Sequence, residues 1–410
     1  MTANLRQSDT AAPSKLRGIR MARISTVPFY VAAQLKHQIT FLGQQGAKVA
    51  VVSRDEQEQS EFDGLTGVSY YAIDIPRAIA PWRDFKALIQ LILFFRKQKI
   101  QLAHSTTPKA GLLSAVAAFL ANVPIRLHTF TGQQWVTMRG VKRWLSRFSD
   151  LLIGKLNTRC YTDSPGQRQY LIDEKLLAAD RLLVLGAGSL AGVDIRRFSH
   201  ERFPPVERRT LRESLNIPAL APVLLFIGRI TIDKGVRELL LAFQNLKERG
   251  SDAHLVFVGR FDADSGVEGN VSQDDLKNIQ DVHFAGYTEI PEAYMAITDI
   301  LCLPSYREGF GTVVIEAAAM GVPTIGTNIY GLSDAIVHNE TGILVPPRDV
   351  DALTDALKQL LADGQLRATM GAAARRRAQE VFDAEKFNLA IAGEYASLLH
   401  NAGIVGTSGP

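Results

Sequence analysis

The sequence has only two cysteines in 410 residues, Cys160 and Cys302. Both lie in apolar, strand-like stretches, and two thiols so far apart make no metal-ligand spacing. This scarcity excludes a disulfide scaffold and a thiolate zinc site, and it favours a reducing compartment.

Long apolar runs are also missing. The longest, 87–95 and 111–123, fall well short of the roughly 20 residues that a membrane-spanning helix needs. Residues 1–16 are polar and lack the apolar core of a signal peptide. We therefore expect a cytoplasmic protein that associates with a membrane, if at all, only at its surface.

Acidic residues are scarce in the first half of the chain. Residues 1–204 contain 28 Lys and Arg against 15 Asp and Glu, whereas the remainder contains 18 against 27. Such asymmetry predicts a basic domain that faces an anionic partner. Nucleic acid is not favoured as that partner, because no aromatic platform or recognition motif accompanies the charge.

Short apolar runs alternate with helical patterns along most of the chain. This order predicts an α/β fold with two doubly wound, Rossmann-like domains, and the length suits two domains. We place the first domain at 17–198, a charged linker at 199–222 and the second domain at 223–380. A final helix is expected at 381–400.

One stretch, 300–331, combines a buried strand, a glycine loop and an alanine-rich helix. Thr312 is the expected N-cap of this helix, and Gly321 ends it. The free backbone N–H groups at such a helix start favour a bound diphosphate. Glu308 and Glu316 flank these amides, and we expect their carboxylates to accept hydrogen bonds from sugar and ribose hydroxyls.

Two cations follow the first strand of the second domain, in the segment Arg229–Gly235. Arg229 and Lys234 would bring positive charge to the end of that strand, close to the helix that starts near Gly311. A diphosphate leaving group needs such charge, and side chains can supply it in place of a metal. Asp262 and Asp264 form a D-x-D pair in a polar loop, which we interpret as solvated, so no metal or cofactor is expected.

Two histidines, His104 and His128, lie at the expected carboxyl ends of strands in the first domain. Ligands bind at these ends in open α/β sheets, although a single histidine is often only a packed residue. His104 and His128 are therefore candidates for the reacting centre.

The spacing of Glu308 and Glu316, with seven residues between them, resembles the E-x7-E motif of the retaining glycosyltransferases of family 4. Other matches to that family are Gly309, Phe310, Gly311, the Gly-Val-Pro at 321–323, Thr341-Gly342 and Val345-Pro346. The segments 106–111 and 128–133 resemble the bacterial branch that acts on capsular, exopolysaccharide or O-antigen intermediates.

This resemblance implies the GT-B architecture, in which two Rossmann-like domains face each other across a cleft. It also implies that the final helix, 381–400, crosses back to the first domain. It implies transfer of a hexosyl or N-acetylhexosaminyl group from a nucleoside-diphosphate sugar, with UDP as the first expectation for the nucleotide. It also implies retention of configuration and a polyprenyl-diphosphate-linked saccharide as the acceptor.

The resemblance also implies roles for individual residues. The catalytic candidates are Glu308, Arg229, Lys234, His128 and His104. The donor-binding candidates are Gly228, Glu316, Phe310, Gly311, Thr312, Gly188, Asp194 and Tyr287. The acceptor-side candidates are Thr131 and Lys109.

A basic amphipathic helix is expected within 136–160. Its expected membrane contacts are Arg139, Lys142, Arg143, Trp144 and Arg147. Cations beside an aromatic residue are typical of a helix that lies on an anionic membrane surface, here the inner face of the plasma membrane. The alternative is a core helix with a solvated basic face.

Two other functions stay open at this point. A nucleotide-sugar epimerase of the same two-domain shape would act without an acceptor. A non-catalytic, membrane-associated subunit would keep the basic helix but would have no use for Arg229, Lys234, Glu308 and Glu316 together.

Overall fold

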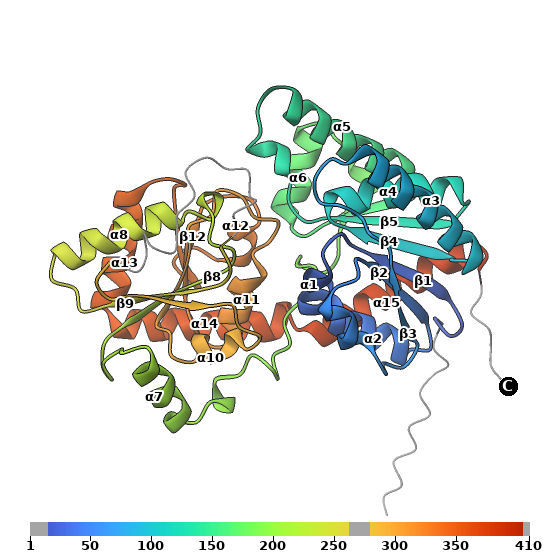
Figure 1. Cartoon of the computed structure of the whole chain (residues 1–410). Helices are drawn as coiled ribbons and strands as arrows, with labels where there is room; N and C mark the ends of the chain where they lie inside the picture. The colour runs from blue at the N-terminus through green and yellow to red at the C-terminus, as the bar shows by residue number, and fades with distance from the viewer. Residues whose placement is uncertain (1–14, 262–278, 405–410) are drawn as a thin grey trace, which may run out of the picture. The chain divides into compact units, whose positions relative to one another are not determined.

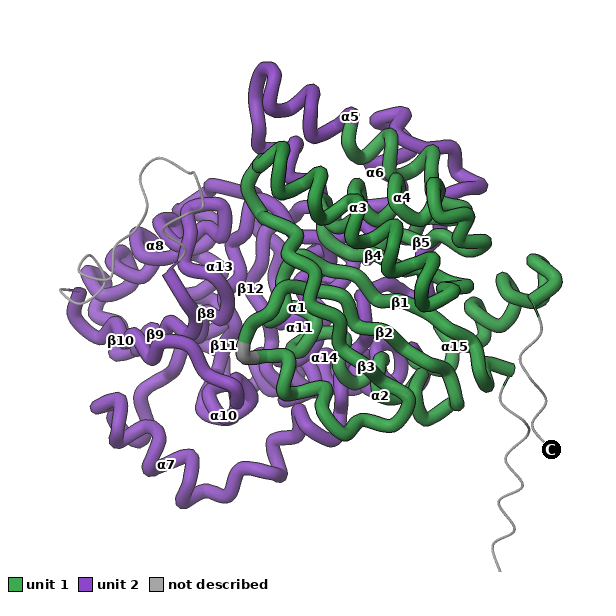
Figure 2. Tube along the Cα trace, turned by 45° about the vertical axis from the view of Figure 1, so that its right-hand side comes forward, with its two compact units in different colours: residues 1–129, 149–160, 388–410 green, residues 130–148, 161–387 purple. Residues whose placement is uncertain are grey.

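The structure is a computed structural model that describes residues 15–261 and 279–404. The chain divides into two compact units (Figures 1 and 2). Unit 1 consists of Met1–Thr129, Ser149–Cys160 and Asn388–Pro410, and unit 2 of Phe130–Phe148 and Tyr161–Phe387. The D-x-D pair at 262–264 lies outside the described residues.

The first sheet has seven strands in the order β3-β2-β1-β4-β5-β6-β7. Its strands are β1 Arg20–Ile24, β2 Lys48–Ser53, β3 Val68–Ala72, β4 Leu102–Thr106, β5 Ile125–Phe130, β6 Arg159–Thr162 and β7 Leu182–Val184. The pairs from β3 to β5 are parallel, and the strand order reverses between β1 and β4. This reversal is the topological switch point of a doubly wound sheet.

Helices cover both sides of this sheet. Alternate residues of β1 face opposite sides: Ala22 and Ile24 pack with α3 and α4 in one hydrophobic core, whereas Arg23 reaches Tyr395 of α15 on the other side. The helices up to β7 are α1 Pro28–Tyr30, η1 Val31–Leu35, α2 Lys36–Gln44, η2 Gln57–Phe62, α3 Pro81–Lys97, α4 Pro108–Leu120, η3 Gln134–Val136, α5 Gly140–Leu156, α6 Pro165–Asp173 and η4 Ala179–Arg181.

The second sheet has six strands in the order β10-β9-β8-β11-β12-β13. Its strands are β8 Val223–Ile227, β9 His254–Val258, β10 Val282–Gly286, β11 Ile300–Leu303, β12 Thr324–Thr327 and β13 Gly342–Val345. All of its pairs are parallel, and its switch point lies between β8 and β11. Both sheets thus confirm the predicted α/β fold class with two doubly wound, Rossmann-like domains.

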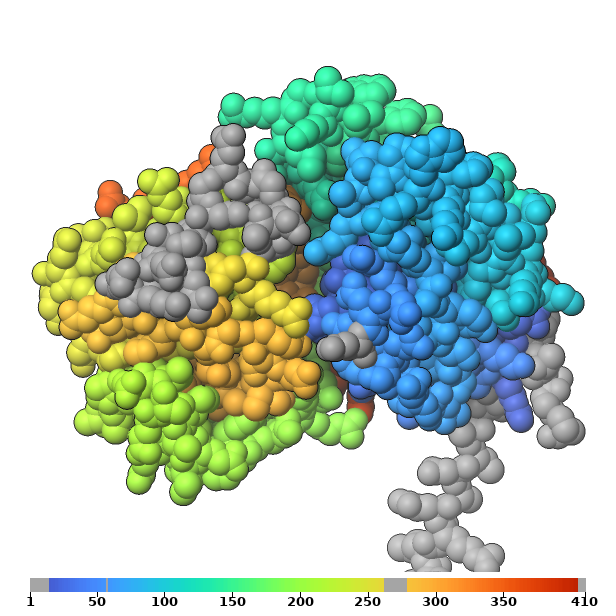
Figure 3. Space-filling model, viewed as in Figure 1, coloured from blue at the N-terminus to red at the C-terminus, as the bar shows by residue number. Residues whose placement is uncertain are grey.

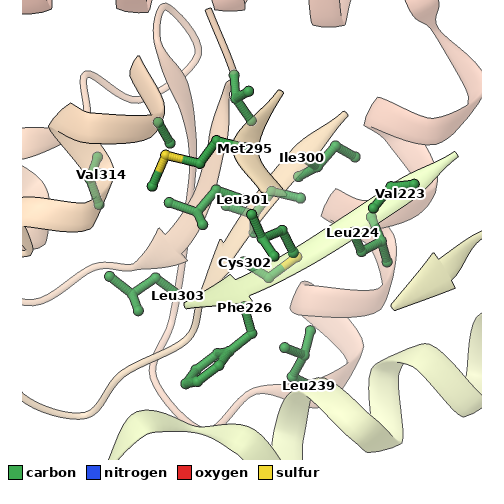
Figure 4. Packing of buried hydrophobic residues seen from close by; sticks show 14 of the residues in the cluster. Val223, Leu224, Phe226, Leu239, Met295, Ile300, Leu301, Cys302, Leu303 and Val314 are labelled. Atoms are coloured by element: carbon green, nitrogen blue, oxygen red, sulfur yellow. The ribbon is translucent and has the colours of Figure 1, made fainter. Parts of the chain in front are cut away.

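The inner strands β8, β9 and β11 of the second sheet are buried on both faces and are nearly continuous apolar runs, as expected for a parallel sheet covered by helices. Figure 4 shows Phe226 of β8 and Leu303 of β11 within this packed core. The remaining helices are η5 His200–Arg202, α7 Pro205–Ser214, η6 Ile232–Lys234, α8 Val236–Glu248, α10 Pro291–Met295, α11 Thr312–Ala319, α12 Leu332–Ala335, α13 Val350–Ala362, α14 Gly364–Val381 and α15 Ala384–Asn401.

Two local expectations need correction. The N-cap of α11 is Gly311 and not Thr312, because Gly311 adopts the left-handed conformation (φ 81°, ψ 61°) that turns the loop into the helix, and Thr312 is already helical. The 18-residue helix α14 was not predicted, although Asp363 caps it by accepting a hydrogen bond from Leu366 N at 2.8 Å. The small residues that this helix buries, which include Ala374 and Ala378, alternate in the sequence with a run of arginines. The arginines make the apolar stripe of the helix difficult to recognise.

Both cysteines lie within strands, Cys160 in β6 and Cys302 in β11, and both are buried and free. Burial raises the pKa of the Cys302 thiol well above its ordinary value. Among the described residues, no helix combines the length and the hydropathy that crossing a bilayer requires. The domain boundaries drawn from the sequence stay predictions.

Candidate functional site

The loops that follow β8 and β11 meet at the switch point of the second sheet. β8 and β11 are neighbours, with Leu225 opposite Leu301, so the loops at their carboxyl ends lie together. Gly235 packs against the other loop so closely that a Cβ at this position would lie 2.0 Å from the carbonyl oxygen of Pro304. Gly235 also has φ 69°, so glycine is required there for both contact and conformation.

This packing brings Lys234 and Glu308 together. Lys234 Nζ lies 2.6 Å from Glu308 Oε1, and the same oxygen accepts a hydrogen bond of 2.8 Å from Ser305 Oγ. Both charged side chains are mostly buried. Because the ammonium has three donors, Lys234 can keep this ion pair and still bind an anion.

A second ion pair, between Arg307 and Asp233, also links the loops that follow β8 and β11. Arg307 donates to Asp233 Oδ2 at 3.2 Å, and Thr231 donates to Asp233 Oδ1 at 2.5 Å. Burial raises the pKa of Asp233, but the hydrogen bond from Thr231 and the nearby Lys234, Arg307 and Arg229 outweigh it and hold this pKa below its ordinary value. Asp233 is therefore a fixed negative charge that orients the segment bearing Arg229 and Lys234.

The helix α11 points its N-terminus at this pair. It begins at Thr312, directly after Gly311, and neither residue supplies a side-chain cap. The first N–H groups of a helix have no partner within the helix, and they carry partial positive charge. Together with Lys234 and the exposed Arg229, they form an arrangement that suits a diphosphate.

Glu316 lies one turn further along α11 and is only partly exposed. Burial raises its pKa to about 7, Arg197 opposes this shift, and Glu292 adds to it. Arg197 forms a bidentate pair with Glu292, with N···O distances of 2.9 and 3.0 Å. Neither Arg197 nor Glu292 was among the predicted site residues, since both are far from Glu316 in the chain.

Two glycines, Gly309 and Gly188, let other loops of unit 2 approach the segment 308–311. A Cβ on Gly309 would lie 2.9 Å from the carbonyl oxygen of Thr131 and 2.8 Å from Asp163 Oδ2. A Cβ on Gly188 (φ 110°) would lie 3.2 Å from the Phe310 ring. The structure therefore brings Gly188, Thr131 and Phe310 close to the segment that contains Glu308.

Asp163 is a member of this group that the sequence did not suggest as a site residue. Its carboxyl is buried, and its Oδ1 has no hydrogen-bond partner among the described residues. Burial raises its pKa to about 8. A neutral carboxyl is the form that such surroundings favour. Ser164, next to it, caps α6 by accepting a hydrogen bond from Gln167 N at 3.0 Å.

The other predicted donor residues have local roles in this structure. Asp194 Oδ1 accepts hydrogen bonds from the backbone of Arg196 and Arg197, at 3.0 and 3.1 Å, so it shapes its own turn. Tyr287 is partly exposed, and the guanidinium of Arg260 lies 4.2 Å from its ring centroid. Gly228 has φ 149° and leads β8 into the Arg229 loop.

The two predicted histidines lie in unit 1 and are buried. His104 Nδ1 is 2.5 Å from the Tyr395 hydroxyl and Nε2 is 2.7 Å from the Thr129 hydroxyl, so protein groups occupy both ring nitrogens. His128 Nδ1 is 2.9 Å from Ser105 Oγ. Burial holds the pKa of His104 well below its ordinary value and lowers that of His128 to about 3, so both are neutral near pH 7.

Lys109, the other acceptor-side candidate, is also paired within unit 1. Its Nζ lies 2.6 Å from Asp84 Oδ1 and donates to the carbonyl of Ala78. The pair ties the start of α4 to the start of α3, so Lys109 has a structural role at least.

The basic helix is α5, and its apolar residues are not in the core. Val141, Trp144, Leu145 and Phe148 are exposed, and Trp144 stacks on Phe148 with a centroid distance of 5.5 Å. Of the predicted membrane contacts, Arg139, Lys142 and Arg143 are exposed, and Arg147 is half-buried beside Glu174. The guanidinium of Arg143 lies 5.8 Å from the ring centroid of Trp135, which is buried.

The described residues contain no group of three or more His, Cys, Asp and Glu side chains that could hold a metal ion. At the switch point of the second sheet, positive charge comes from side chains that include Arg229 and Lys234 and from the α11 amides.

Two family descriptions match successive parts of the chain. Residues 31–188 match the glycosyl transferase 4-like domain, and residues 207–377 match the glycosyl transferases of group 1. The second range contains both strands of the second sheet's switch point, β8 and β11, and the first range contains β4 of the first sheet's switch point.

Three known proteins illustrate the similarity. The capsular polysaccharide biosynthesis glycosyltransferase CapM of Staphylococcus aureus is 30% identical over 360 residues, covering 86% of this chain and 90% of that protein. UDP-Gal:alpha-D-GlcNAc-diphosphoundecaprenol alpha-1,3-galactosyltransferase of Escherichia coli is 27% identical over 305 residues, covering 72% and 75%. Anabaena HepE in complex with UDP and glucose has a TM-score of 0.75 at 18% identity, covering 92% of this chain and 100% of that chain.

The structural similarity to HepE confirms the predicted GT-B type of fold, and the sequence similarity to CapM extends over nearly the whole of both chains. Of the functions left open by the sequence, sugar transfer is the one that these relatives share. The chain therefore belongs to the family 4 glycosyltransferases of the GT-B fold, and it is a glycosyltransferase.

Proposed function

We propose that this enzyme transfers a hexosyl or N-acetylhexosaminyl group from a UDP-sugar to a polyprenyl-diphosphate-linked saccharide, with retention, during synthesis of a bacterial surface polysaccharide. The observation that carries the proposal is the Lys234–Glu308 ion pair of 2.6 Å beside the N-terminus of α11. It combines a cation for a phosphate, a carboxylate for hydroxyls and free amides for an anion in one place.

In the proposed complex, the diphosphate of the donor binds Arg229, Lys234 and the amides of Gly311 and Thr312. Negative charge grows on this diphosphate as its bond to the sugar breaks, and donors fixed in advance stabilise that charge without reorganising. Asp233, which orients this segment, keeps the two cations in position.

Glu308 and Glu316 would bind different parts of the donor, the transferred sugar and the ribose. Glu308, held by Lys234 and Ser305, accepts hydrogen bonds from the transferred sugar. Glu316, in its ionised form, accepts hydrogen bonds from the two ribose hydroxyls. Phe310, Gly188, Asp194 and Tyr287 complete the donor site in this proposal.

The proposed reaction needs no enzymic nucleophile. The bond between the anomeric carbon and the β-phosphate oxygen breaks, and the acceptor oxygen forms its bond to the same carbon on the same face. The departing phosphate oxygen takes the proton of the acceptor hydroxyl, so atoms and charge balance. His104, His128, Thr131 and Lys109 are the candidates for contacts with the acceptor or the reacting sugar.

The proposed acceptor is carried by a membrane lipid. The name of the Escherichia coli relative specifies a UDP-Gal donor and a diphosphoundecaprenol-linked acceptor, and HepE was solved with UDP and glucose. The exposed cations of α5 beside Trp144 would bring the enzyme to the anionic inner face of the plasma membrane, each cation near the surface contributing about 1 kcal/mol.

The test is release of nucleoside diphosphate from a panel of UDP-, GDP- and ADP-sugars, with and without a lipid-linked acceptor extract. We expect release from a UDP-sugar that increases when the extract is added, and an anomeric linkage in the product that matches the donor. Release from no donor would contradict the proposal, and interconversion of the sugars without release would instead indicate an epimerase.

A further inference from the structure

The helix α3 exposes a row of large apolar side chains. Trp82, Phe85, Ile89 and Leu93 recur at intervals of three and four residues, so they lie on one side of the helix, and between 40% and 86% of each is exposed. We call these four residues the α3 face. This part of unit 1 is the light-blue surface toward the viewer in Figure 3.

The fold of α3 does not depend on the α3 face. The opposite side of the helix, with Ala87, Leu91, Phe94 and Phe95, already supplies the apolar contacts to the core of unit 1. A surface helix normally has one apolar stripe, which it buries, and polar residues elsewhere. A second apolar stripe, left exposed, therefore indicates an external partner.

Neighbouring residues of unit 1 extend this surface at both ends. Ile79, just before the helix, is highly exposed. At the other end, Arg96 donates a hydrogen bond of 2.9 Å to the carbonyl of Leu120, which brings the exposed Phe119 and Leu120 of α4 next to the end of α3. The apolar surface is thus longer than α3 itself.

The charge around the α3 face is positive. The exposed cations on α3 are Arg83, Lys86, Arg96 and Lys97. The acidic residue of the helix, Asp84, is mostly buried and paired with Lys109 at 2.6 Å. Among the described residues, none forms an ion pair or hydrogen bond with Lys86 or Lys97, whereas Arg83 is paired with Asp74 at 2.6 Å.

An apolar stripe bordered by cations is complementary to an anionic lipid bilayer, in which acyl chains lie beneath negative headgroups. A second copy of the chain is a poorer partner, because a two-fold contact through this surface would place like charges opposite each other. Trp82 at the start of the stripe suits the interface, where tryptophan is enriched.

We propose that the α3 face docks on an anionic bilayer, with α3 parallel to the membrane plane and Trp82 in the headgroup region. This inference deepens the proposed function. It rests on that proposal only for the membrane lipid that carries the acceptor. It assigns membrane contact to a helix other than α5, which carries the basic residues expected from the sequence.

Tryptophan fluorescence of the full chain can test this contact directly. The sequence has three tryptophans, of which Trp135 is buried, so Trp144→Phe leaves Trp82 as the exposed reporter. With phosphatidylcholine vesicles containing phosphatidylglycerol, we expect a blue shift of the emission and quenching by brominated acyl chains. Vesicle binding without either change would place another surface on the membrane and overturn the proposal.

Substitution provides the quantitative test. Phe85→Ser with Leu93→Ser should weaken vesicle binding at least tenfold, since two large side chains no longer leave water for the bilayer. Leu220→Ser is the matched control, because Leu220 is a leucine that is 96% exposed and belongs to unit 2, whereas α3 belongs to unit 1. Equal loss in both variants, or no loss in either, would contradict the proposal.

Charge reversal separates the contribution of the cations. Lys86→Glu with Lys97→Glu should lower affinity for anionic vesicles by about fivefold or more for each cation and leave binding to neutral vesicles unchanged. Concentration-dependent dimerisation that Phe85→Ser with Leu93→Ser abolishes, without vesicle binding, would identify a second copy as the partner and overturn the proposal.

Failure of the membrane contact can be distinguished from failure of the proposed function. Release of nucleoside diphosphate by slow donor hydrolysis, measured without lipid, should be the same for the wild type and for every α3 variant. If vesicles bind as expected but no donor is cleaved, the docking inference stands and the proposed function fails. If donor is cleaved but Trp82 never enters the bilayer, the docking inference fails and the proposed function stands.

Discussion

The switch points of the two sheets use their polar residues in opposite ways. Between β1 and β4, Arg23 lies opposite His104, and both bind the hydroxyl of Tyr395 from α15 in a fully buried cluster. Between β8 and β11, Lys234 and Glu308 pair at a place that solvent still reaches. The same topology thus supports a fully buried polar cluster in one sheet and a partly exposed pair of charged groups in the other.

The two switch points differ in whether protein groups use all the hydrogen-bonding atoms of each polar side chain. The hydroxyls of Tyr395 and Thr129 occupy both nitrogens of His104, and burial keeps the ring neutral. Lys234 keeps donors available to a ligand, and Glu308 keeps an oxygen that is not used by Lys234 or Ser305. A carboxyl-end position in an open sheet is therefore a reason to examine a residue, and its hydrogen bonds decide whether it can act on a substrate.

The largest effect is expected from removing the cation of the second switch point. Lys234→Ala should lower kcat about 10²- to 10³-fold, because the developing charge on the diphosphate loses a fixed donor. Steady-state release of nucleoside diphosphate measures it, and Lys234→Arg should restore part of the rate.

Lys247 offers a matched control for that change. It forms an ion pair of 2.5 Å with Asp281 in the same unit and is buried to a similar extent. Lys247→Ala should cost a comparable amount of stability and leave kcat within about twofold, as expected for a structural pair. If the two alanine variants lose activity equally, Lys234 acts through stability, and the comparison of the two switch points no longer holds.

The buried cluster of the first switch point should respond in stability first. His104→Ala leaves a cavity and two hydroxyls without their partner, which costs about 2–4 kcal/mol of unfolding free energy. The folded-state pKa of His104 is below its unfolded value, so the wild type loses stability as pH falls below about 6.5, and the difference should shrink at pH 5.

Urea unfolding at pH 7.5 and pH 5 measures this change, and donor hydrolysis is measured beside it. Unchanged stability together with a large fall in kcat would show that His104 acts on the substrate, and it would remove the contrast between the two switch points.

Asp163 lies between these two cases, because it is buried like His104 but adjoins the Glu308 loop. Its folded-state pKa is raised to about 8, so the wild type loses stability as pH rises from about 4 to 8. Asp163→Asn removes this loss and keeps the shape. We expect the variant to equal the wild type near pH 4 and to exceed it by about 2 kcal/mol or more at pH 8.5, measured by thermal or urea unfolding. A constant difference across this range would mean that Asp163 is ionised in the native state.

Local sequence patterns predicted most of the elements around the site. Residues that are neighbours in the chain determine the strands β8, β9 and β11 and the end of α11 at Gly321. Apolar runs and glycine positions therefore predict these features. The pair of Lys234 and Glu308 could be anticipated because both follow neighbouring parallel strands.

Other parts of the site could not be predicted in this way. Arg197 and Glu292 come close to Glu316, and Asp163 comes close to Gly309, only through tertiary packing. No local sequence pattern indicates such a contact. The same holds for the burial of His104, which depends on Tyr395 almost 300 residues later in the chain. The exposure of Trp82 and Leu93 was also hidden, since α3 is apolar on both of its sides.

The smallest effect is expected at Glu316, where protonation competes with donor binding. Its pKa is about 7, and only the carboxylate accepts hydrogen bonds from both ribose hydroxyls, so wild-type affinity for UDP should rise about five- to tenfold between pH 6 and pH 8. Glu316→Gln cannot ionise, and it should bind UDP weakly and with the same affinity at both pH values. Calorimetric titration of UDP at pH 6, 7 and 8 measures both proteins. If the Gln variant keeps the pH dependence, the titrating group lies elsewhere. Asp233 is then not the cause, since its pKa is held below the ordinary carboxyl range.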